Sequence, residues 1–387
     1  MMITLHPDPG SRTADVIVVG GGIHGCSAAL HLIKRGVSVT VLEKDYVGRH
    51  ASGVNAGGVR RLGRDLAEVP LAQAAYEYWR DMPALVDDDC GYRATRYLKV
   101  ARSDEDMAKA RQRVADLNAR GFTHEDVVDQ KTLREYLPAV APHCVGALHV
   151  DGDGSALPFQ TTQAFKRRGE KLGVNFHEET PVIDIKRHAG NWHVETHKGI
   201  FEAPTVINAA GAWGGVLAAK LGDDVPLQAH APMLAITARM PAFATAVVGA
   251  LSGALSFKQF ENGTVLIGGG VRGRAFPDTN RTALDMKGMA EFLSTARDVF
   301  PIMQHANIMR TWAGIEGYTP DNLPVISAGR AEGIVHAFGF SAHGFQLAPG
   351  VGEFVADLAT GVTPRLSLDA FNVSRFQQIG SGPAVQS

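Results

Sequence analysis

The sequence predicts an α/β fold with two parts: a parallel sheet covered by helices, and a second part on a mixed or antiparallel sheet. Residues 15–44 read as strand, glycine turn, helix and strand, the order typical of a parallel sheet buried on both faces. A strand, a glycine loop and a helix recur at 334–360. Between them, 226–238 and 255–270 indicate further strands, with apolar residues alternating along the second segment.

The first glycine turn has the spacing Gly-x-Gly-x-x-Gly, formed by Gly20, Gly22 and Gly25. The first glycine permits a sharp turn, the second lets the backbone approach a pyrophosphate, and the third lets the helix pack close to the strand. Glu43 ends the next strand, at a distance where a carboxylate can accept both ribose hydroxyls. This Rossmann-like unit predicts a dinucleotide site. The acid disfavours NADP, so FAD and NAD remain.

Composition limits the other possibilities. The 387 residues suffice for two domains or for one large domain with an inserted lobe, and the net charge of −2 gives no sign of a nucleic-acid partner. The three cysteines form no Cys-x-x-Cys pair, so we expect no metal site. We find neither a membrane-spanning stretch of ~18 apolar residues nor a signal peptide in residues 1–14. A cytoplasmic location is expected, with peripheral contact to the inner membrane left open.

The remaining elements follow from hydrophobic periodicity and turn residues. Helices are expected at 71–78, 104–119, about a dozen residues from 158, 284–300 and 348–360. Strands are expected at 97–101, 173–176, 182–185, 192–201, 206–213, within 309–326 and at 334–338. Residues 48–61 are expected to form a loop and a helix start near the cofactor, 151–158 a turn cluster, and 381–387 a disordered tail.

Three further segments carry a family resemblance. They are Val-Ile-Asn-Ala-Ala-Gly-Ala-Trp at 206–213, Trp-Ala-Gly-Ile-Glu-Gly-Tyr-Thr-Pro-Asp at 312–321, and His-Ala-Phe-Gly-Phe-Ser-Ala-His-Gly-Phe-Gln at 336–346. With the first glycine turn they resemble the D-amino-acid oxidase superfamily of FAD enzymes, in the branch of glycine oxidase, sarcosine oxidase and D-amino-acid dehydrogenases. The chain looks most like the flavin subunits of opine oxidase, hydrogen cyanide synthase and D-hydroxyproline dehydrogenase. The resemblance runs from 15 to 361 and favours FAD over NAD.

The resemblance implies a domain organisation. A Rossmann-like FAD-binding domain of the glutathione-reductase type would be discontinuous, covering 14–88, 146–225 and 306–375. A substrate-binding domain would cover 89–145 and 226–305. Residues 1–13 and 376–387 would be tails.

The resemblance also implies which residues contact FAD. They are Gly20, Gly22, Ile23, His24, Gly25, Glu43, Lys44, Ser52, Asn55, Ala56, Gly57, Gly58, Val182, Ala210, Gly211, Trp213, Gly314, His343, Gly344, Phe345, Gln346 and Leu347. Asn55 stands where dehydrogenases of the dimethylglycine type carry a histidine for covalent flavin. Non-covalent FAD is therefore expected.

The implied reaction removes a hydride from a carbon that bears an amine and delivers it to flavin N5. The resulting imine hydrolyses to an oxo acid. The candidates for catalytic or substrate-side roles are Arg60, Lys258, Arg310, Glu316, Tyr318 and His343, with Arg61 and Arg272 as further basic candidates. Solvated surface charge is the alternative for Arg60 and Arg61, a solvent-facing side chain for Lys258, and a structural histidine for His343.

Glu316 departs from the family pattern. Glycine oxidase has an arginine at this position that binds the substrate carboxylate. An acid here could face a cationic group of the substrate, or it could be a structural residue paired with a nearby arginine.

Several alternatives stay open. The substrate could be glycine, a D-amino acid, a cyclic imino acid or an opine, and homo-oligomers are possible. The chain could instead be the flavin subunit of an electron-transfer complex with partner subunits and little activity alone. A third possibility is an NAD-linked dehydrogenase, which would be colourless when purified.

Overall fold

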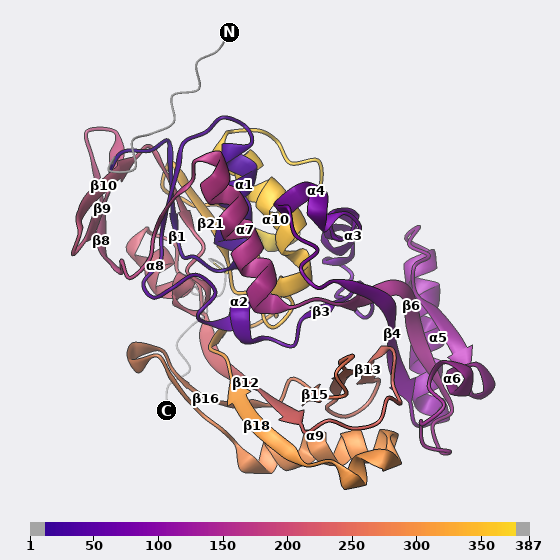
Figure 1. The fold of residues 1–387 in the computed structure, drawn as a ribbon. Coiled ribbons are helices and arrows are strands. Elements are labelled where there is room, and N and C mark those ends of the chain that lie inside the picture. The colour runs from indigo at the N-terminus through magenta and orange to yellow at the C-terminus, as the bar shows by residue number, and fades with distance from the viewer. Residues whose placement is uncertain (1–11, 377–387) are drawn as a thin grey trace, which may run out of the picture.

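The computed structural model of the chain describes residues 12–376. The expected tails at 1–13 and 376–387, and the disorder expected at 381–387, lie almost entirely outside the described residues. Within 12–376 no helix is long and apolar enough to cross a membrane. The chain forms several sheets flanked by helices, as the predicted α/β class requires (Figure 1).

A six-stranded sheet forms the upper part of the molecule in Figure 1, in the order β20-β21-β11-β1-β2-β7. Its strands are β1 (Val16–Val19), β2 (Val39–Leu42), β7 (Asn175–His177), β11 (Thr205–Asn208), β20 (Val325–Ala328) and β21 (Ile334–Phe338). All neighbours pair in parallel except β20, which runs antiparallel to β21. Val18 lies opposite Val41 on one side and Ile207 on the other.

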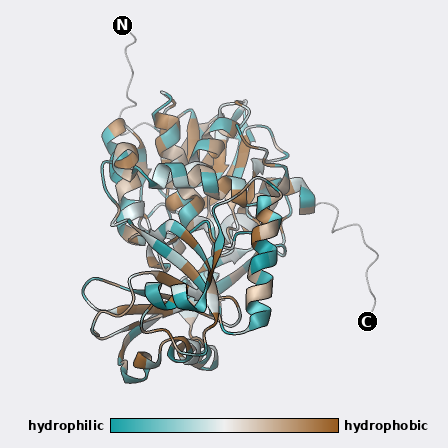
Figure 2. Cartoon of the chain, turned by 90° about the vertical axis from the view of Figure 1, so that its right-hand side faces the viewer, coloured by the Kyte–Doolittle hydropathy of each residue, from teal (hydrophilic) through white to brown (hydrophobic). Residues whose placement is uncertain are grey.

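Helices cover this sheet. They are α1 (Ile23–Ile33), α3 (Val69–Trp79), α7 (Pro158–Leu172) and α10 (Gly344–Ala359). Helix α1 packs against both α7 and α10, and α10 also packs against α3. Val18, Leu347 and Phe354 belong to the core between them and are fully buried. Burying one such side chain stabilises the fold by about 1.5–3 kcal/mol. Figure 2 shows hydrophobic residues concentrated in the half of the molecule that contains this sheet.

A small antiparallel sheet connects β7 to β11. It consists of β8 (Val182–His188), β9 (Asn191–Thr196) and β10 (Gly199–Ala203). Val194 and Phe201 are buried in a shared cluster with Ile17 of β1.

A twelve-stranded mixed sheet forms the second part of the molecule. Its strands are β3 (Gly58–Val59), β4 (Arg93–Ala101), β5 (Asp126–Asp129), β6 (Gly146–Ser155), β12 (Gln228–Thr237), β13 (Val247–Ala250), β14 (Ser256–Gln259), β15 (Val265–Gly268), β16 (Arg272–Phe276), β17 (Arg281–Ala283), β18 (Ile308–Ala313) and β19 (Glu316–Tyr318). Most neighbours are antiparallel, but β4 and β13 pair in parallel. Helix α9 (Met286–Val299) buries Phe292 and Val299 in this core.

The remaining helices are short or peripheral. They are α2 (Ala51–Val54), α4 (Met82–Val86), α5 (Asp104–Asn118), α6 (Gln130–Tyr136) and α8 (Gly214–Lys220). Helix α5 starts with a side-chain cap, because Ser103 Oγ accepts the N–H of Asp106 at 3.2 Å.

The prediction of a turn cluster at 151–158 is wrong. Residues 151–155 continue β6, and a glycine of this segment lets the neighbouring strand pack closely. A Cβ at Gly154 would lie 1.9 Å from the Arg93 carbonyl oxygen, so only glycine lets β6 approach β4 here. Helix α10 also begins earlier than predicted, at Gly344.

The division into two domains stays a prediction. Strands β6, β18 and β19 fall within segments assigned to the FAD-binding domain, yet they pair in the twelve-stranded sheet. The chain therefore crosses between the two sheets inside those segments.

Candidate functional site

A cavity of about 640 Å³ lies between the carboxyl ends of the parallel strands and the twelve-stranded sheet. Its walls come from the start of α1, the end of β2, the loop at 50–58, the segment at 209–217 and the residues that precede α10. Open parallel sheets bind ligands at this edge. Most residues expected to contact FAD line this one cavity.

The turn after β1 brings three backbone segments together. Gly20 has φ +114°, and a Cβ on it would lie 2.4 Å from the carbonyl oxygen of Ala209. A Cβ on Gly25 would lie 2.0 Å from the Gly20 carbonyl oxygen. Gly25 therefore lets α1 pack against the turn, and it does not itself line the cavity.

The start of α1 and the segment at 51–57, which begins with α2, form a cradle. Ser52 Oγ accepts the N–H of Ile23 at 2.9 Å. Asn55 fixes the loop, because its Nδ2 donates to the Ala51 carbonyl at 2.9 Å and its Oδ1 accepts the Gly57 N–H at 2.8 Å. A helix N-terminus framed by small residues suits a pyrophosphate.

The acid after β2 lies at one end of the cavity. Glu43 accepts the N–H of Gly21 at 2.7 Å and the N–H of Asp45 at 2.8 Å. Beside it, Lys44 Nζ lies 3.3 Å from the centre of the Trp213 ring and donates to Asn280 Oδ1. Asn280 belongs to the β16–β17 connection, so the twelve-stranded sheet reaches this end as well.

His24 supplies an unpartnered polar group. Its ring stacks on Phe340 with 3.5 Å between ring centroids, and neither ring nitrogen has a hydrogen-bond partner among residues 12–376. Burial lowers the pKa of His24 to about 3, so the imidazole is neutral. The glycine cradle, the acid and this orphaned imidazole together fit a dinucleotide such as FAD.

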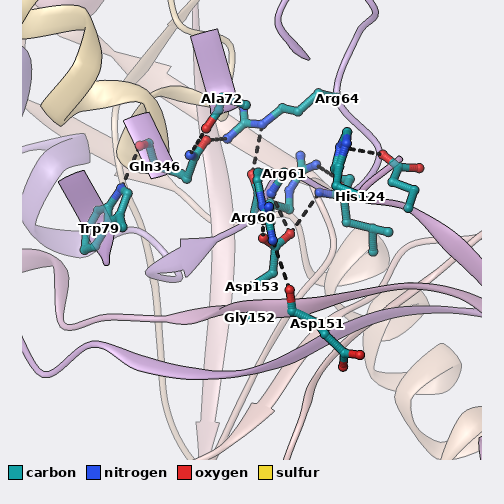
Figure 3. A network of polar contacts seen from close by, with 12 residues as sticks. Arg60, Arg61, Arg64, Ala72, Trp79, His124, Asp151, Gly152, Asp153 and Gln346 are labelled. Atoms are coloured by element: carbon teal, nitrogen blue, oxygen red, sulfur yellow. Dashed lines mark hydrogen bonds and ion pairs between the residues drawn. The ribbon is translucent and has the colours of Figure 1, made fainter. Parts of the chain in front are cut away.

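A polar network, shown in part in Figure 3, supports the part of the cavity wall formed by Arg60, Arg64 and His343. Arg64 donates to Gln346 Oε1 and to the His343 carbonyl, both at 2.9 Å, and to the Arg60 carbonyl at 3.1 Å. Glu68 Oε2 lies 3.1 Å from His343 Nδ1 and 3.7 Å from Arg64 Nη1. Burial alone would raise the pKa of Glu68, but His343 and Arg64 lower it below its usual value.

Two predicted flavin-ring contacts point elsewhere. Gln346 donates to the Ala72 carbonyl at 2.9 Å, and its own carbonyl accepts from Trp79 Nε1 at 2.7 Å (Figure 3). Leu347 is fully buried in the core. Neither lines the cavity, because both side chains of this first turn of α10 point into the protein, whereas His343, Gly344 and Phe345 line the cavity.

Glu316 lines the cavity at the start of β19. Burial raises its pKa to about 7, although the Ala342 N–H and the charge of Arg272 lower it partly. Arg272 lies over the ring of Tyr318, with Cζ 3.9 Å from the ring centre, and Tyr318 is buried outside the cavity lining. An arginine is thus close to Glu316, but no ion pair within 4.0 Å joins them in the described chain.

Three basic candidates lie off the cavity surface, as Arg272 also does. Lys258 is buried behind the loop, since a Cβ on Gly57 would lie 3.2 Å from its Nζ, and burial lowers its pKa to about 8. Arg61 is paired with Asp153 at 2.8 Å, so it is neither solvated nor free for substrate. Arg310 is exposed on β18 and does not line the cavity.

The lining residues that the sequence did not predict include Arg64, Tyr97 and Lys99. Tyr97 and Lys99 lie two positions apart in a predicted strand, so they face the same side. That spacing was the available signal. No group of three or more potential metal ligands occurs within 12–376.

Comparison with known proteins agrees with this site. A family model described as "FAD dependent oxidoreductase" matches residues 15–358. The chain is 26% identical to glycine oxidase of Geobacillus kaustophilus, covering 93% of this chain and 97% of that protein. It is 27% identical to hydrogen cyanide synthase subunit HcnC of Pseudomonas aeruginosa, covering 97% and 99%.

The fold has close structural counterparts. The crystal structure of L-proline dehydrogenase from P. horikoshii superimposes with a TM-score of 0.86 at 27% identity, covering 95% of this chain and 98% of that one. The resemblance drawn from the motifs is therefore confirmed, as is the choice of FAD over NAD. Since the family match extends over nearly the whole chain, the protein belongs to the FAD-dependent oxidoreductase family that includes glycine and sarcosine oxidases.

Proposed function

We propose that the protein oxidises the C–N bond of a small amino acid, imino acid or opine-like secondary amine, with non-covalently bound FAD. One observation supports this above the others: a single cavity is lined both by the dinucleotide cradle at α1 and by the charged side chains of Arg60, Lys99 and Glu316. A cofactor and a polar substrate can therefore occupy the same cavity.

The residues of the chain would bind and orient the substrate. When bound, FAD supplies the electron acceptor, which takes a hydride from the carbon that bears the nitrogen. Positioning that C–H bond and excluding water are the contributions of the protein. Glu316 can hold or release a proton near neutral pH, because its pKa is about 7. The imine product then adds water, its C–N bond breaks, and the nitrogen leaves as ammonia or an amine (in a cyclic imine as an amino group on the same molecule), which yields an oxo acid.

Dissociable FAD is supported by Asn55. Its side chain holds the loop at 51–57 and has no nucleophilic atom to attach a flavin. Precipitation of the holoprotein with acid should release all of the flavin into the supernatant. Flavin that stays with the pellet would contradict the proposal.

A second candidate is the flavin subunit of a multi-subunit dehydrogenase. The relative HcnC is by its name a subunit of hydrogen cyanide synthase, which favours this alternative. A cytoplasmic location is part of the proposal, supported by three buried, unpaired cysteines.

The test uses the purified holoprotein with glycine, sarcosine, D-amino acids, D-proline, hydroxyprolines and opines. Each compound is supplied with oxygen and, separately, with an artificial electron-accepting dye. We expect one class to give an oxo acid in amounts equal to the acceptor reduced. FAD-loaded protein that gives no oxo acid with either acceptor would contradict autonomous catalysis, and activity only after adding partner subunits would establish the second candidate.

A further inference from the structure

Positive charge exceeds negative charge at the substrate end of the cavity. The neighbouring arginines have partners: Arg61 lies 2.8 Å from Asp153, Arg113 2.6 Å from Glu125, and Arg64 3.7 Å from Glu68. Two cations, Arg60 and Lys99, line the cavity and have no carboxylate within 4.0 Å in the described chain. Both side chains are partly buried. Charges removed from water are normally paired, so this part of the cavity favours an anionic ligand.

The ammonium group of Lys99 has no hydrogen-bonding or ion-pair partner among the described residues. The charge of Glu125 acts on Lys99, but this carboxylate already accepts hydrogen bonds from Nε and Nη2 of Arg113 and from the Gly63 N–H at 2.7 Å. A Cβ on Gly63 would lie 2.5 Å from Lys99 Nζ, so the glycine leaves room for the ammonium group.

Two further donors accompany Lys99. Tyr97 lies two positions earlier on β4 and therefore faces the same side. Its hydroxyl has no hydrogen-bond partner among the described residues. Arg60 follows β3, and its Nη1 donates a hydrogen bond to the Leu62 carbonyl at 2.6 Å. The other N–H groups of its guanidinium remain available to a ligand. A guanidinium, a phenol and an ammonium thus line the same cavity, with Arg60 close enough to Lys99 for their charges to interact.

The other basic side chains are placed differently. Arg310 is exposed, Arg272 lies against Tyr318, and the position where the family resemblance puts a carboxylate-binding arginine is Glu316. We propose that Arg60, Tyr97 and Lys99 bind a carboxylate of the substrate, and that Lys99 determines the preference for amines that carry a carboxylate over amines that lack one. This inference rests on the proposed function, since it assumes that the same cavity takes the amine.

The experiment measures anion binding without turnover. Holoprotein is titrated with acetate at constant ionic strength set by sodium chloride, and with acetamide, which has the same shape and no charge. Binding is followed by calorimetry and by the visible flavin spectrum. The variants are Lys99→Met, Lys99→Arg and, as a matched control, Lys109→Met, whose lysine is exposed on α5 and paired with Glu105.

We expect Lys99→Met to raise the Kd for acetate at least tenfold, Lys99→Arg to restore most of the affinity, and Lys109→Met to change nothing. Acetamide binding should be equal in all of them. If Lys99→Met loses FAD or unfolds, Arg60→Gln takes its place and the same weakening is expected. An unchanged acetate Kd in a folded, FAD-loaded variant would overturn the inference, as would chloride competing equally with acetate.

The two proposals can fail separately. If acetate binds through Lys99 but no amine is oxidised with any acceptor, the proposed function fails and the carboxylate site stands. If an amino acid is oxidised and its KM is the same in Lys99→Met and wild type, the carboxylate site fails and the function stands.

Discussion

At the scale of single residues, Gly20 and Gly36 separate two effects that glycines can have. Both have positive φ, but a Cβ at Gly20 would clash with Ala209, whereas nothing lies within 4 Å of one at Gly36. Gly36→Ala should therefore cost only the left-handed backbone, about 1 kcal/mol of unfolding free energy. Gly20→Ala should cost several times more and abolish FAD retention on gel filtration. Equal effects in denaturant unfolding would contradict the role given to Gly20.

Glu316 gives a prediction about pH. Its folded-state pKa of about 7 lies above the ~4.3 of an unfolded glutamate, so the folded state binds the proton more tightly. Ionising it costs stability, and this cost grows as the pH rises from about 4 to about 7. Glu316→Gln removes the cost. The apoprotein variant should match wild type near pH 4 and exceed it by about 1–3 kcal/mol at pH 8.

Unfolding free energies at several pH values measure this difference directly. A gap between the two proteins that stays constant with pH would show that Glu316 is not buried as a neutral acid. Narrowing of the gap as the pH rises would reverse the sign and contradict the electrostatic account.

Some residue positions followed from sequence and others did not. Gly20, Gly22 and Glu43 belong to one local unit of strand, turn and strand, so their spacing alone placed them near a ligand. Lys99 and Arg64 reach the same cavity through contacts distant in sequence. Nothing local to them reveals which charges find partners.

At the scale of elements, β6 carries two aspartates with different roles. Asp153 is buried, pairs with Arg61 at 2.8 Å and accepts the N–H groups of Arg61 and Leu62. Asp151 is exposed and pairs with Arg96. Asp153→Ala leaves a buried charge without a partner and should cost about 3–5 kcal/mol, whereas Asp151→Ala should cost at most about 1 kcal/mol.

Chemical denaturation of the two variants tests this pair. The Asp153 variant should also bind acetate more weakly, because Asp153 anchors the segment that carries Arg60. Similar losses of stability in both variants would mean that β6 is held by its strand pairing alone.

The error at 151–158 belongs to this scale. Asp-Gly-Asp-Gly is a turn signal in isolation, yet here the glycines permit β6 to pass close to β4 and Asp153 satisfies the backbone of another segment. Tertiary contacts overrode the local preference. Where strong local periodicity existed, as in α5 and α9, the predicted bounds were within two residues of those observed.

At the scale of the whole molecule, the cavity is shared by both sheets. Its lining includes Gly22 beside the parallel sheet and Leu234 on β12 of the twelve-stranded sheet. FAD should therefore stabilise both together, by about 2.7 kcal/mol at a free concentration one hundred times its Kd. Calorimetry of apoprotein and holoprotein should show one transition that moves to higher temperature. Two transitions, of which FAD moves only one, would contradict a shared site.

The sequence predicted the fold class and most strands, but not how distant strands pair. The parallel pairing of β4 with β13, and the position of β6 between β4 and β5, join segments of the chain that no local pattern connects. The predicted boundaries of two domains would depend on this pairing.

The most direct test of the central claim is anaerobic reduction of the bound flavin. The visible spectrum of holoprotein is recorded without oxygen while sarcosine, D-proline and opines are added, each beside an amine that lacks the carboxylate, such as pyrrolidine for D-proline. The account predicts loss of the ~450 nm flavin band with at least one of the amines that carry a carboxylate. The matching amine without a carboxylate should leave the band unchanged. A protein that holds FAD and is bleached by none of them would contradict it.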